Sequence, residues 1–219
     1  MCGRYTLTKP KKSIESHFRA QLPKGEHRQR YNIAPTQSLP VIISHHDERK
    51  IEAMRWGLVP SWTKDLKTQS PLINARAETI QEKPSFKNSF KTKRCLVPAD
   101  GFYEWVKKDH SKVPYRIHLA SEELFAFAGI WAEWGKGDAR LQSFAILTTE
   151  ANSALQCLHH RMPVILALDT YDPWLDASAT QEELTTLLKP YPSGLMAYHE
   201  VSLKVNSPRN DGPECLAPV

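Results

Sequence analysis

The sequence has few cysteines and no long apolar segment. Its 219 residues contain four cysteines, none in a CxxC pair, and this spacing argues against both a zinc site and a disulfide scaffold. No run of about 18 apolar residues could span a bilayer, and the first residues, MCGRYTLTKPKKS, lack the apolar core of a secretory signal. We therefore predict a cytoplasmic protein, nucleoid-associated if bacterial, with reduced thiols, no membrane segment and no bound metal.

Linkers and internal repeats are also missing. The 16 prolines and 9 glycines are scattered along the chain, and no stretch is of low complexity. With 41% hydrophobic residues, this length suits one core of ordinary size. We predict a single domain over residues 1–219 and, because no heptad or interface stripe is visible, a monomer.

Positive charge is in modest excess. Lysines and arginines number 29 against 24 aspartates and glutamates, which gives a net charge of +5. Basic side chains gain free energy from counterion release when they meet phosphates, so this balance favours a polyanionic partner such as nucleic acid. Many basic proteins bind no nucleic acid, and charge alone does not identify the partner.

Short apolar runs separated by turn residues predict most of the regular structure. Helices are expected at 11–19, at 150–158 and after Thr180, where Glu183 completes a capping box. The strands do not alternate regularly with helices, so we predict an α+β fold with a mostly antiparallel, curved or barrel-like β core and flanking helices. The expected strands are 39–45, 52–59, 95–106, 114–119, 124–134, 143–149 and 163–168.

Cys2 is the first candidate for chemistry. Removal of Met1 ahead of this small residue would leave an α-amine and a thiol on adjacent carbons. The amine can condense with an aldehyde to a Schiff base, and the thiol can close onto the same carbon to give a thiazolidine that resists hydrolysis better than an imine. Both groups are established nucleophiles. The alternative is an incidental cysteine at a frayed chain end.

Glu104 is the second candidate. In ADGFYEWV, strand alternation puts Glu104 on one face with Phe102 and Val106, and puts Tyr103 and Trp105 on the other. An ionised carboxylate between apolar neighbours is costly to bury, and a protonated Glu104 could donate a proton. The alternative is an edge-strand carboxylate that faces water or pairs with a lysine.

Two further motifs hold polar pairs. In PLINARAET, alternation points Asn74 and Arg76 to one side of an extended segment, where they could orient a substrate and hold a phosphate, although turn capping by Asn74 fits nearly as well. In ALQCLHHRMPVIL, His159 or His160 could face a cleft and move protons. A solvent-exposed histidine pair is the commoner case.

Contacts to nucleic acid would come from basic side chains and aromatic rings. Trp62 and Trp105 are candidate stacking surfaces, but most of the six tryptophans should lie in the core. An exposed helix face would explain the lysines as well as a binding surface does. The basic candidates are Arg4, Arg76 and Arg161, together with the stretch Lys83, Lys87, Lys91, Lys93 and Arg94.

The order of the motifs carries a resemblance that no single motif carries. MCGRY, YNIAPTQ, RWGLVPSW, LINARAET, CLVPADGFYEW and HHRMPVIL follow one another over nearly the whole chain, which closely resembles the SOS response-associated peptidase (SRAP) family. The resemblance implies the family's curved, largely antiparallel β fold with helices around it. It also implies that a mature N-terminal cysteine forms a thiazolidine with abasic sites in single-stranded DNA.

The resemblance assigns roles motif by motif. Cys2 would be the nucleophile, and Asn74 would orient its amine or stabilise the adduct. Glu104 would be the acid–base residue, while His159 would assist opening of the sugar ring and later proton transfers, including reversal of the crosslink. The DNA contacts would be Arg4, Arg76 and Arg161 at phosphates, Asn32 and Thr148 lining the site, and Trp62 at a base beside the gap.

We therefore predict a protein that processes abasic sites in single-stranded DNA and needs no cofactor. The imine would either close to the thiazolidine or permit β-elimination of the 3′ phosphate, a lyase activity. One alternative is a cysteine peptidase, in which Cys2 attacks an amide with His159 as base, including removal of the protein's own leader. Another is a non-catalytic binding module, which would keep its function in a Cys2→Ser variant. A preference for junctions of single and double strands is left open.

Overall fold

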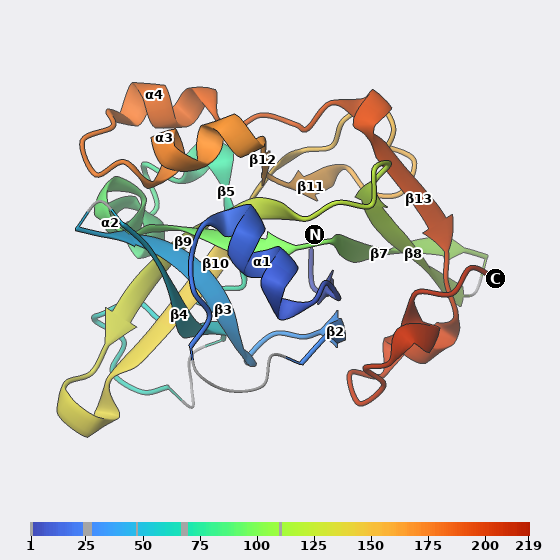
Figure 1. Cartoon of the computed structure of the whole chain (residues 1–219), viewed down its shortest axis with the longest axis horizontal. Coiled ribbons are helices and arrows are strands. Elements are labelled where there is room, and N and C mark those ends of the chain that lie inside the picture. The colour runs from blue at the N-terminus through green and yellow to red at the C-terminus, as the bar shows by residue number, and fades with distance from the viewer. Residues whose placement is uncertain (1, 24–27, 47, 67–69, 110) are drawn as a thin grey trace.

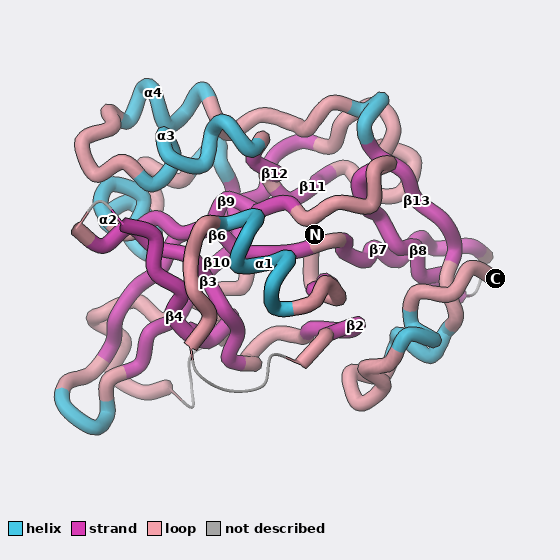
Figure 2. Tube along the Cα trace, in the orientation of Figure 1, coloured by secondary structure: helices cyan, strands magenta, loops and turns pink. Residues whose placement is uncertain are grey.

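The chain forms two β-sheets with helices on the outside (Figure 1, Figure 2). The computed structural model describes residues 2–23, 28–46, 48–66, 70–109 and 111–219. The strands are β1 (Tyr5–Leu7), β2 (Arg30–Ile33), β3 (Ser38–His45), β4 (Glu48–Trp56), β5 (Asn74–Arg76), β6 (Arg94–Ala99), β7 (Gly101–Lys108), β8 (Ser111–Leu119), β9 (Phe125–Trp134), β10 (Leu141–Glu150), β11 (Arg161–Pro163), β12 (Ile165–Leu166) and β13 (Met196–Glu200).

Five strands close into a barrel. β10 pairs in parallel with β4, and the ring continues through the antiparallel pairs β4–β3, β3–β6, β6–β9 and β9–β10. β5 joins β10 in parallel, while β11 and β12 add antiparallel pairs to β10 and β9. Closure leaves these five strands without a free edge. The predicted α+β fold with a mostly antiparallel, barrel-like core is confirmed.

The second sheet is open and antiparallel, in the order β13-β8-β7-β1-β2. Its strand β1 is anchored on the barrel by Tyr5, whose ring meets those of Trp56 and Phe127 edge-on, with centroids 5.2 and 5.8 Å apart. Tyr5 is buried, and aromatic contacts of this kind add to the free energy of burying the rings. The strand β1 is thereby fixed against the barrel core.

The predicted strand 95–106 is wrong as a single element, because the chain leaves the barrel for the second sheet at Asp100. β6 ends at Ala99 and β7 begins at Gly101. The buried Asp100 carboxylate accepts hydrogen bonds from the Thr6 hydroxyl and, at 2.6 Å, from the Thr8 backbone amide. The corner between the two sheets is therefore marked by Asp100, whose carboxylate is hydrogen-bonded by Thr6 and Thr8.

The helices lie outside the strands, and three of them gather at the upper left of Figure 2. The α1 range confirms the predicted helix at 11–19, and Thr180 and Glu183 form the predicted capping box at α4. None of the described helices is both long and apolar enough to cross a membrane. The bounds are α1 (Lys11–Phe18), α2 (Pro84–Thr92), α3 (Tyr171–Leu175) and α4 (Gln181–Thr186).

The helix expected at 150–158 is wrong, and the segment is a series of turns. Glu150 on β10 pairs with Arg161 on β11, and the Ala151 amide donates to the His160 carbonyl at 3.0 Å. The ends of this segment must therefore meet. A straight helix of this length would hold its ends roughly 13 Å apart and could not close the hairpin.

After β13 the chain turns back toward β2 (Figure 1). There Val201, Val205 and Cys215 pack with Tyr103 in a small second core, with Trp105 at its edge. Phe102, on the other face of β7, belongs to the main core. The alternation predicted for this strand is thus confirmed, and Glu104 faces the barrel side.

Candidate active site around Cys2

The N-terminal residues are held between β5 and β7. The Asn74 Nδ2 amide donates to the Cys2 carbonyl at 2.9 Å, and the Tyr103 amide of β7 donates to the Arg4 carbonyl at 3.0 Å. The Cys2 side chain is completely buried, with its sulfur 3.8 Å from the Arg4 carbonyl oxygen. Cys2 therefore has a fixed backbone and a sheltered thiol.

The charge of Glu104 acts on both Cys2 and His159. Glu104 is only 5% exposed and follows Tyr103, the residue that pairs with Arg4. Its negative charge acts on both neighbours: it adds to the rise in the pKa of Cys2, and it opposes the fall in the pKa of His159. Coulomb interactions weaken with distance, so the carboxylate lies near both groups. Residues 2, 104 and 159 thus converge on one site.

Burial, and after it the charge of Glu104, raises the pKa of the Cys2 thiol. Cys2 is accordingly protonated at neutral pH, because removing a thiol from water penalises its anion. The thiolate is the nucleophilic form of cysteine, so this environment holds back attack by sulfur.

The hydrogen bonds of His159 define its neutral tautomer. Its Nδ1 accepts the backbone N–H of Arg161 at 2.8 Å and lies 3.2 Å from the Arg161 carbonyl oxygen, and the shorter contact favours the neutral ring with its proton on Nε2. Burial lowers the pKa of His159 and favours this neutral form. The ring also stacks on His160, with centroids 4.3 Å apart, but His160 is exposed. His159 is therefore the histidine whose charge state couples to Glu104.

The polar groups expected at phosphates gather beside this cluster. Thr148 on β10 is level with Arg76 on β5, and two residues further along β10 the pairing strand β11 begins with Arg161. Arg76 is exposed, and among the described residues it has no hydrogen-bond partner. Arg161 Nη2 donates to the Thr148 carbonyl at 2.6 Å and to its hydroxyl at 3.2 Å. Both arginines border the site.

Arg161 also forms a bidentate ion pair that the sequence interpretation missed. Its Nη1 and Nη2 donate to the two carboxylate oxygens of Glu78 at 2.6 and 2.9 Å. Glu78 lies in the short 3-10 helix η1 (Ala77–Thr79) directly after β5. Its place in the motif NARAET, next to two residues chosen as site candidates, was the one signal that could have drawn attention to it.

Two buried atoms at the site have no hydrogen-bond partner within the described part of the chain: Asn74 Oδ1 and Arg161 Nε. Buried polar atoms in folded proteins are nearly always bonded to protein, water or ligand. One is an acceptor and the other a donor. A polar ligand that binds beside Cys2 could satisfy both.

Arg4, Asn32 and Trp105 form contacts with one another and with the C-terminal segment that stabilise the fold. Arg4 Nη1 donates to Asn32 Oδ1 at 2.8 Å, and the Arg4 guanidinium lies over the Trp105 ring at 5.9 Å. The buried Asn32 amide donates to three carbonyls of the C-terminal segment, and Trp105 Nε1 donates to the Asn206 side chain at 2.7 Å. The three residues join the C-terminal segment to the second sheet, on the β7 face opposite Glu104.

Trp62 and Arg94 are the expected DNA contacts that the structure places away from Cys2. Trp62 is 55% exposed and shares a cleft of about 110 Å³ with Ala132, whose partner on β10 is Ser143. Five residues of strand separate Ser143 from Thr148, or about 17 Å. Arg94 is buried and donates to the Trp174 carbonyl at 2.7 Å, so it stabilises the core.

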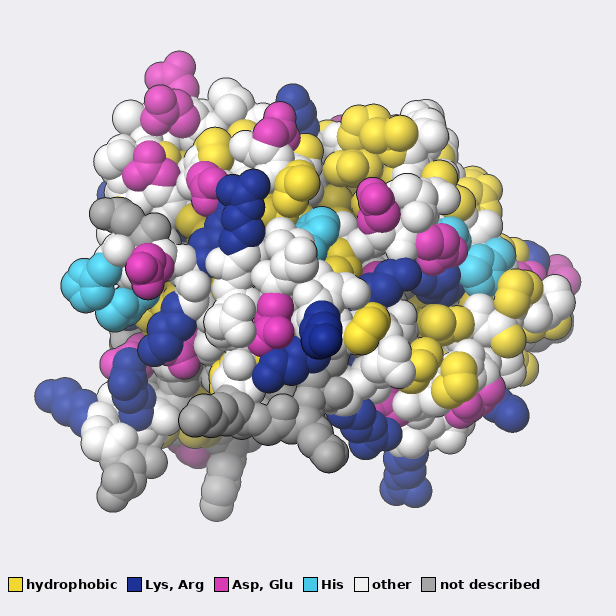
Figure 3. All heavy atoms as spheres, viewed as in Figure 1, with side chains coloured by type: hydrophobic (Ala, Val, Ile, Leu, Met, Phe, Trp, Pro, Cys, Tyr) yellow, Lys and Arg dark blue, Asp and Glu magenta, His cyan; other side chains and the backbone are white. Residues whose placement is uncertain are grey.

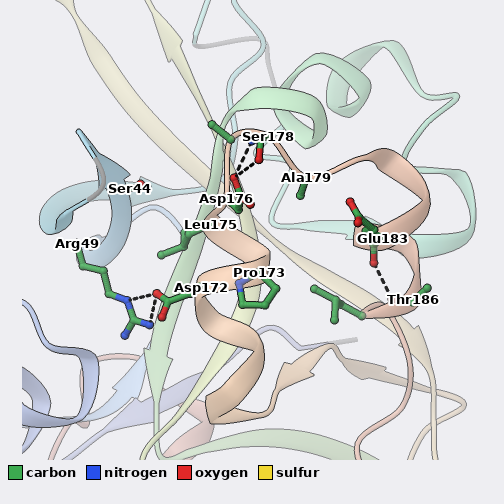
Figure 4. A pocket seen from close by; sticks show the side chains of 12 residues that line it. Ser44, Arg49, Asp172, Pro173, Leu175, Asp176, Ser178, Ala179, Glu183 and Thr186 are labelled. Atoms are coloured by element: carbon green, nitrogen blue, oxygen red, sulfur yellow. Dashed lines mark hydrogen bonds and ion pairs between the residues drawn. The ribbon is translucent and has the colours of Figure 1, made fainter.

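A cavity of about 830 Å³ lies on a different part of the molecule, between α3, α4 and the ends of β3 and β4 (Figure 4). Acidic side chains gather over α3 and α4 in Figure 3, and such a surface repels phosphates. Its carboxylates already have partners within the chain: Asp172 with Arg49, Asp176 with Ser178, and Glu183 with Thr180. No group of three or more metal-ligating side chains is found among the described residues.

A cysteine at position 2, set beside an amide, a carboxylate and an imidazole on a closed barrel, defines the class of the protein. The family model described as "SOS response associated peptidase (SRAP)" matches residues 1–208. The chain belongs to the SRAP family, which confirms the resemblance read from its motifs.

Particular relatives match almost from end to end. The chain is 42% identical over 221 residues to the abasic site processing protein YoqW of Bacillus subtilis, with 99% of each chain covered. It is 39% identical to the abasic site processing protein HMCES of Gallus gallus, covering 90% of this chain and 68% of that protein. A crystal structure of a protein from Bacteroides thetaiotaomicron superposes with a TM-score of 0.89 at 28% identity, and both chains are covered completely.

Proposed function

We propose that this protein processes abasic sites in single-stranded DNA by a covalent thiazolidine crosslink through Cys2, after removal of Met1. Its relatives are named for abasic site processing. The observation that supports the chemistry best is the hydrogen bond from Asn74 Nδ2 to the Cys2 carbonyl, which fixes the backbone of a buried cysteine beside Glu104. An amine and a thiol held in this way can reach one aldehyde carbon.

The reaction begins with the sugar. An abasic sugar is in equilibrium with its open form, and opening transfers the proton of the C1′ hydroxyl while O4′ gains one. Glu104 exchanges these protons, and the Nε2–H of His159 hydrogen-bonds the developing oxygen anion. The product is an aldehyde at C1′. An abasic nucleotide needs no base flipping to enter the pocket.

The amine of Cys2 then adds to C1′. A C–N bond forms, the carbinolamine gains a proton on its hydroxyl and water leaves, which gives an iminium ion that becomes the imine when its nitrogen loses a proton. The Cys2 thiol adds across the C=N bond: sulfur bonds to C1′ and the thiol proton moves to nitrogen. The net change is the loss of one water. A thiol of raised pKa suits this order, because the amine attacks first and the protonated imine is a better electrophile than the aldehyde.

The same imine has a second outcome. Loss of a proton from C2′ followed by departure of the 3′ phosphate breaks the strand, which is a lyase reaction. Thiol addition removes the imine and so prevents this cleavage. The buried position of Cys2 sulfur next to the reacting carbon favours ring closure over elimination.

Peptidase chemistry fits the local groups less well. It needs a Cys2 thiolate and an unprotonated imidazole nitrogen facing it. Burial raises the pKa of the thiol, and the bond from the Arg161 amide to Nδ1 of His159 favours the tautomer with its proton on Nε2. The same residues serve the aldehyde reaction without either change.

The DNA strand runs past Arg76 and Arg161 in this proposal. Exposed Arg76 offers its guanidinium to a phosphate on one side of Cys2, and the two unsatisfied atoms, Asn74 Oδ1 and Arg161 Nε, would bond to polar groups of the bound nucleotide. We propose that the partner is single-stranded DNA and that the protein binds it as a monomer at the Cys2 site.

Intact mass measurement tests the function. The protein is incubated with a single strand that contains one uracil, with and without uracil glycosylase. We expect Met1 to be absent and the protein mass to rise by the mass of the DNA less one water only with the abasic strand. Cys2→Ala should show no adduct, while Cys157→Ala, which changes an exposed cysteine, should react normally.

Other results would redirect the assignment. Mature protein that binds the abasic strand without any adduct would leave a non-catalytic binding module. An adduct that persists in Cys2→Ala would move the nucleophile to another residue. Cleavage of peptides that depends on Cys2, without reaction at abasic DNA, would leave the peptidase alternative.

A further inference from the structure

Glu78 and Arg161 form an ion pair with the geometry that an arginine offers to a phosphate. Both terminal nitrogens of Arg161 are used, one for each oxygen of Glu78, at 2.6 and 2.9 Å. Arginine binds carboxylates and phosphates with the same planar pair of donors. A carboxylate thus occupies the position that would otherwise receive a phosphate oxygen pair.

The two side chains differ in exposure. The Arg161 side chain is 10% exposed and that of Glu78 is 44% exposed, so the carboxylate covers the guanidinium on the solvent side. Exposed Arg76 acts on Glu78 as well, through its charge. A strand that approaches from solvent therefore meets Glu78 before it meets Arg161.

Arg161 does not depend on Glu78 for its position. Its Nη2 also donates to the carbonyl and the hydroxyl of Thr148, which is itself completely buried. These bonds come from the barrel strand β10 and remain if the carboxylate swings away. The guanidinium would then present its free Nη1 edge, already oriented, to an incoming phosphate.

We propose that Glu78 is an internal substitute for phosphate, which occupies Arg161 until a DNA strand displaces it. The proposal rests on the function proposed above and adds a residue that sets its selectivity. Every strand, damaged or not, must exchange Glu78 for a phosphate, but only an abasic strand goes on to form a covalent bond. Glu78 therefore weakens reversible binding to intact DNA without lowering the final yield of crosslink.

The variant Glu78→Gln tests this, because it keeps the shape of the side chain and removes its charge. We expect intact single-stranded DNA to bind the variant about 2- to 5-fold more tightly, the scale of one partly exposed ion pair. The slope of log K against log salt should be steeper by at most roughly 0.7, the value for one full charge on a single strand, because the variant frees no carboxylate that takes up a cation when the strand binds. A residue that only supports the fold would not change this slope upward.

Control variants isolate the effect. Glu82→Gln removes an exposed charge of the same type four residues further along the chain. Its affinity for DNA and its salt dependence should stay close to those of the wild-type protein. In Glu78→Gln combined with Arg161→Gln, the gain in affinity should vanish. An excess of intact strand should slow crosslinking more in Glu78→Gln than in the original protein.

Two outcomes would overturn the proposal. Weaker DNA binding by Glu78→Gln at an unchanged melting temperature would mean that Glu78 positions Arg161 for DNA. Unchanged affinity and slope would mean that no phosphate reaches Arg161. Crosslinking by the wild-type protein is measured in the same series, and its failure would refute the function proposed for Cys2. The change in reversible DNA binding is measured separately and tests the role of Glu78.

Discussion

Protonation of His159 should give the crosslinking reaction a measurable pH dependence. Burial lowers its pKa, so the ring is neutral at pH 7, and protonation of Nδ1 would break the bond from the Arg161 amide. We expect the rate of crosslinking to fall on the acid side with a midpoint below about 6.5, the ordinary pKa of histidine. Single-turnover crosslinking from pH 5 to 8 measures this.

Control variants separate His159 from its neighbour. His159→Gln should lose the acid limb of the profile, while His160→Gln, which changes the exposed ring of the stacked pair, should keep it. An acid limb that survives in His159→Gln would assign it to another group. Stability follows the same direction: the unfolded chain binds the proton more tightly, so the contribution of His159 is intact above about pH 6.5 and is lost as pH falls through its folded pKa.

At the scale of the element, the Asn32 side chain contacts the C-terminal segment at three points. Asn32 Nδ2 lies 3.0 Å from the Val205 carbonyl oxygen, 3.0 Å from that of Ser207 and 2.8 Å from that of Asn210. We expect Asn32→Ala to lower the free energy of unfolding by about 1–3 kcal/mol, because the Ser207 and Asn210 carbonyls lose this donor while the Val205 carbonyl keeps that of Arg4. The segment itself should loosen more than the barrel does.

Limited trypsin digestion measures that loosening. Lys204 and Arg209 are exposed cleavage sites within the segment. Cleavage at both should be faster in Asn32→Ala, whereas Asn88→Ala, on the exposed face of α2, should match the original protein. Equal cleavage rates in the two variants would show that Asn32 does not hold the segment.

The sequence predicted those elements that have a strong pattern of their own. The long barrel strands, α1 and the cap of α4 were found because alternation and capping are local signals. The short strands β1, β2, β5 and β13 were missed, since three to five residues give too little pattern and their pairing partners are distant. The turns at 150–158 follow from hairpin closure, which is not a local property.

At the scale of the molecule, the site too could be predicted from the sequence only in part. Motif order selected Cys2, Asn74, Glu104 and His159, and the fold brings these residues together from four separate strands and loops. Their catalytic roles stay proposals, as does the single domain over 1–219. The ion pair of Glu78 could not be predicted from its place in NARAET alone, because the partner, Arg161, is 83 residues away. The contacts of Asn32 join residues that are still further apart, by 173 to 178 positions.

Two strands of the barrel approach each other closely at a glycine. Gly129 on β9 faces Cys95 on β6, and a Cβ atom at Gly129 would lie 2.7 Å from the Cys95 sulfur and 2.9 Å from a methyl group of Val97. Both neighbours are completely buried on a strand that pairs on both sides, so neither can move away freely. Real Cβ atoms do not approach so closely, and the strands would have to separate.

We therefore expect Gly129→Ala to destabilise the whole molecule by about 1–3 kcal/mol, the usual cost of overpacking a core. Urea unfolding should show a lower midpoint with an unchanged slope. Gly194→Ala is the matched control, because nothing lies within 4 Å of the added Cβ and its midpoint should stay the same. Equal midpoints in the two variants would mean that the barrel adjusts to the methyl group. Since β9 and β6 contribute no residue to the Cys2 cluster, the folded fraction of Gly129→Ala should still crosslink at the original rate, which would separate closure of the barrel from assembly of the site.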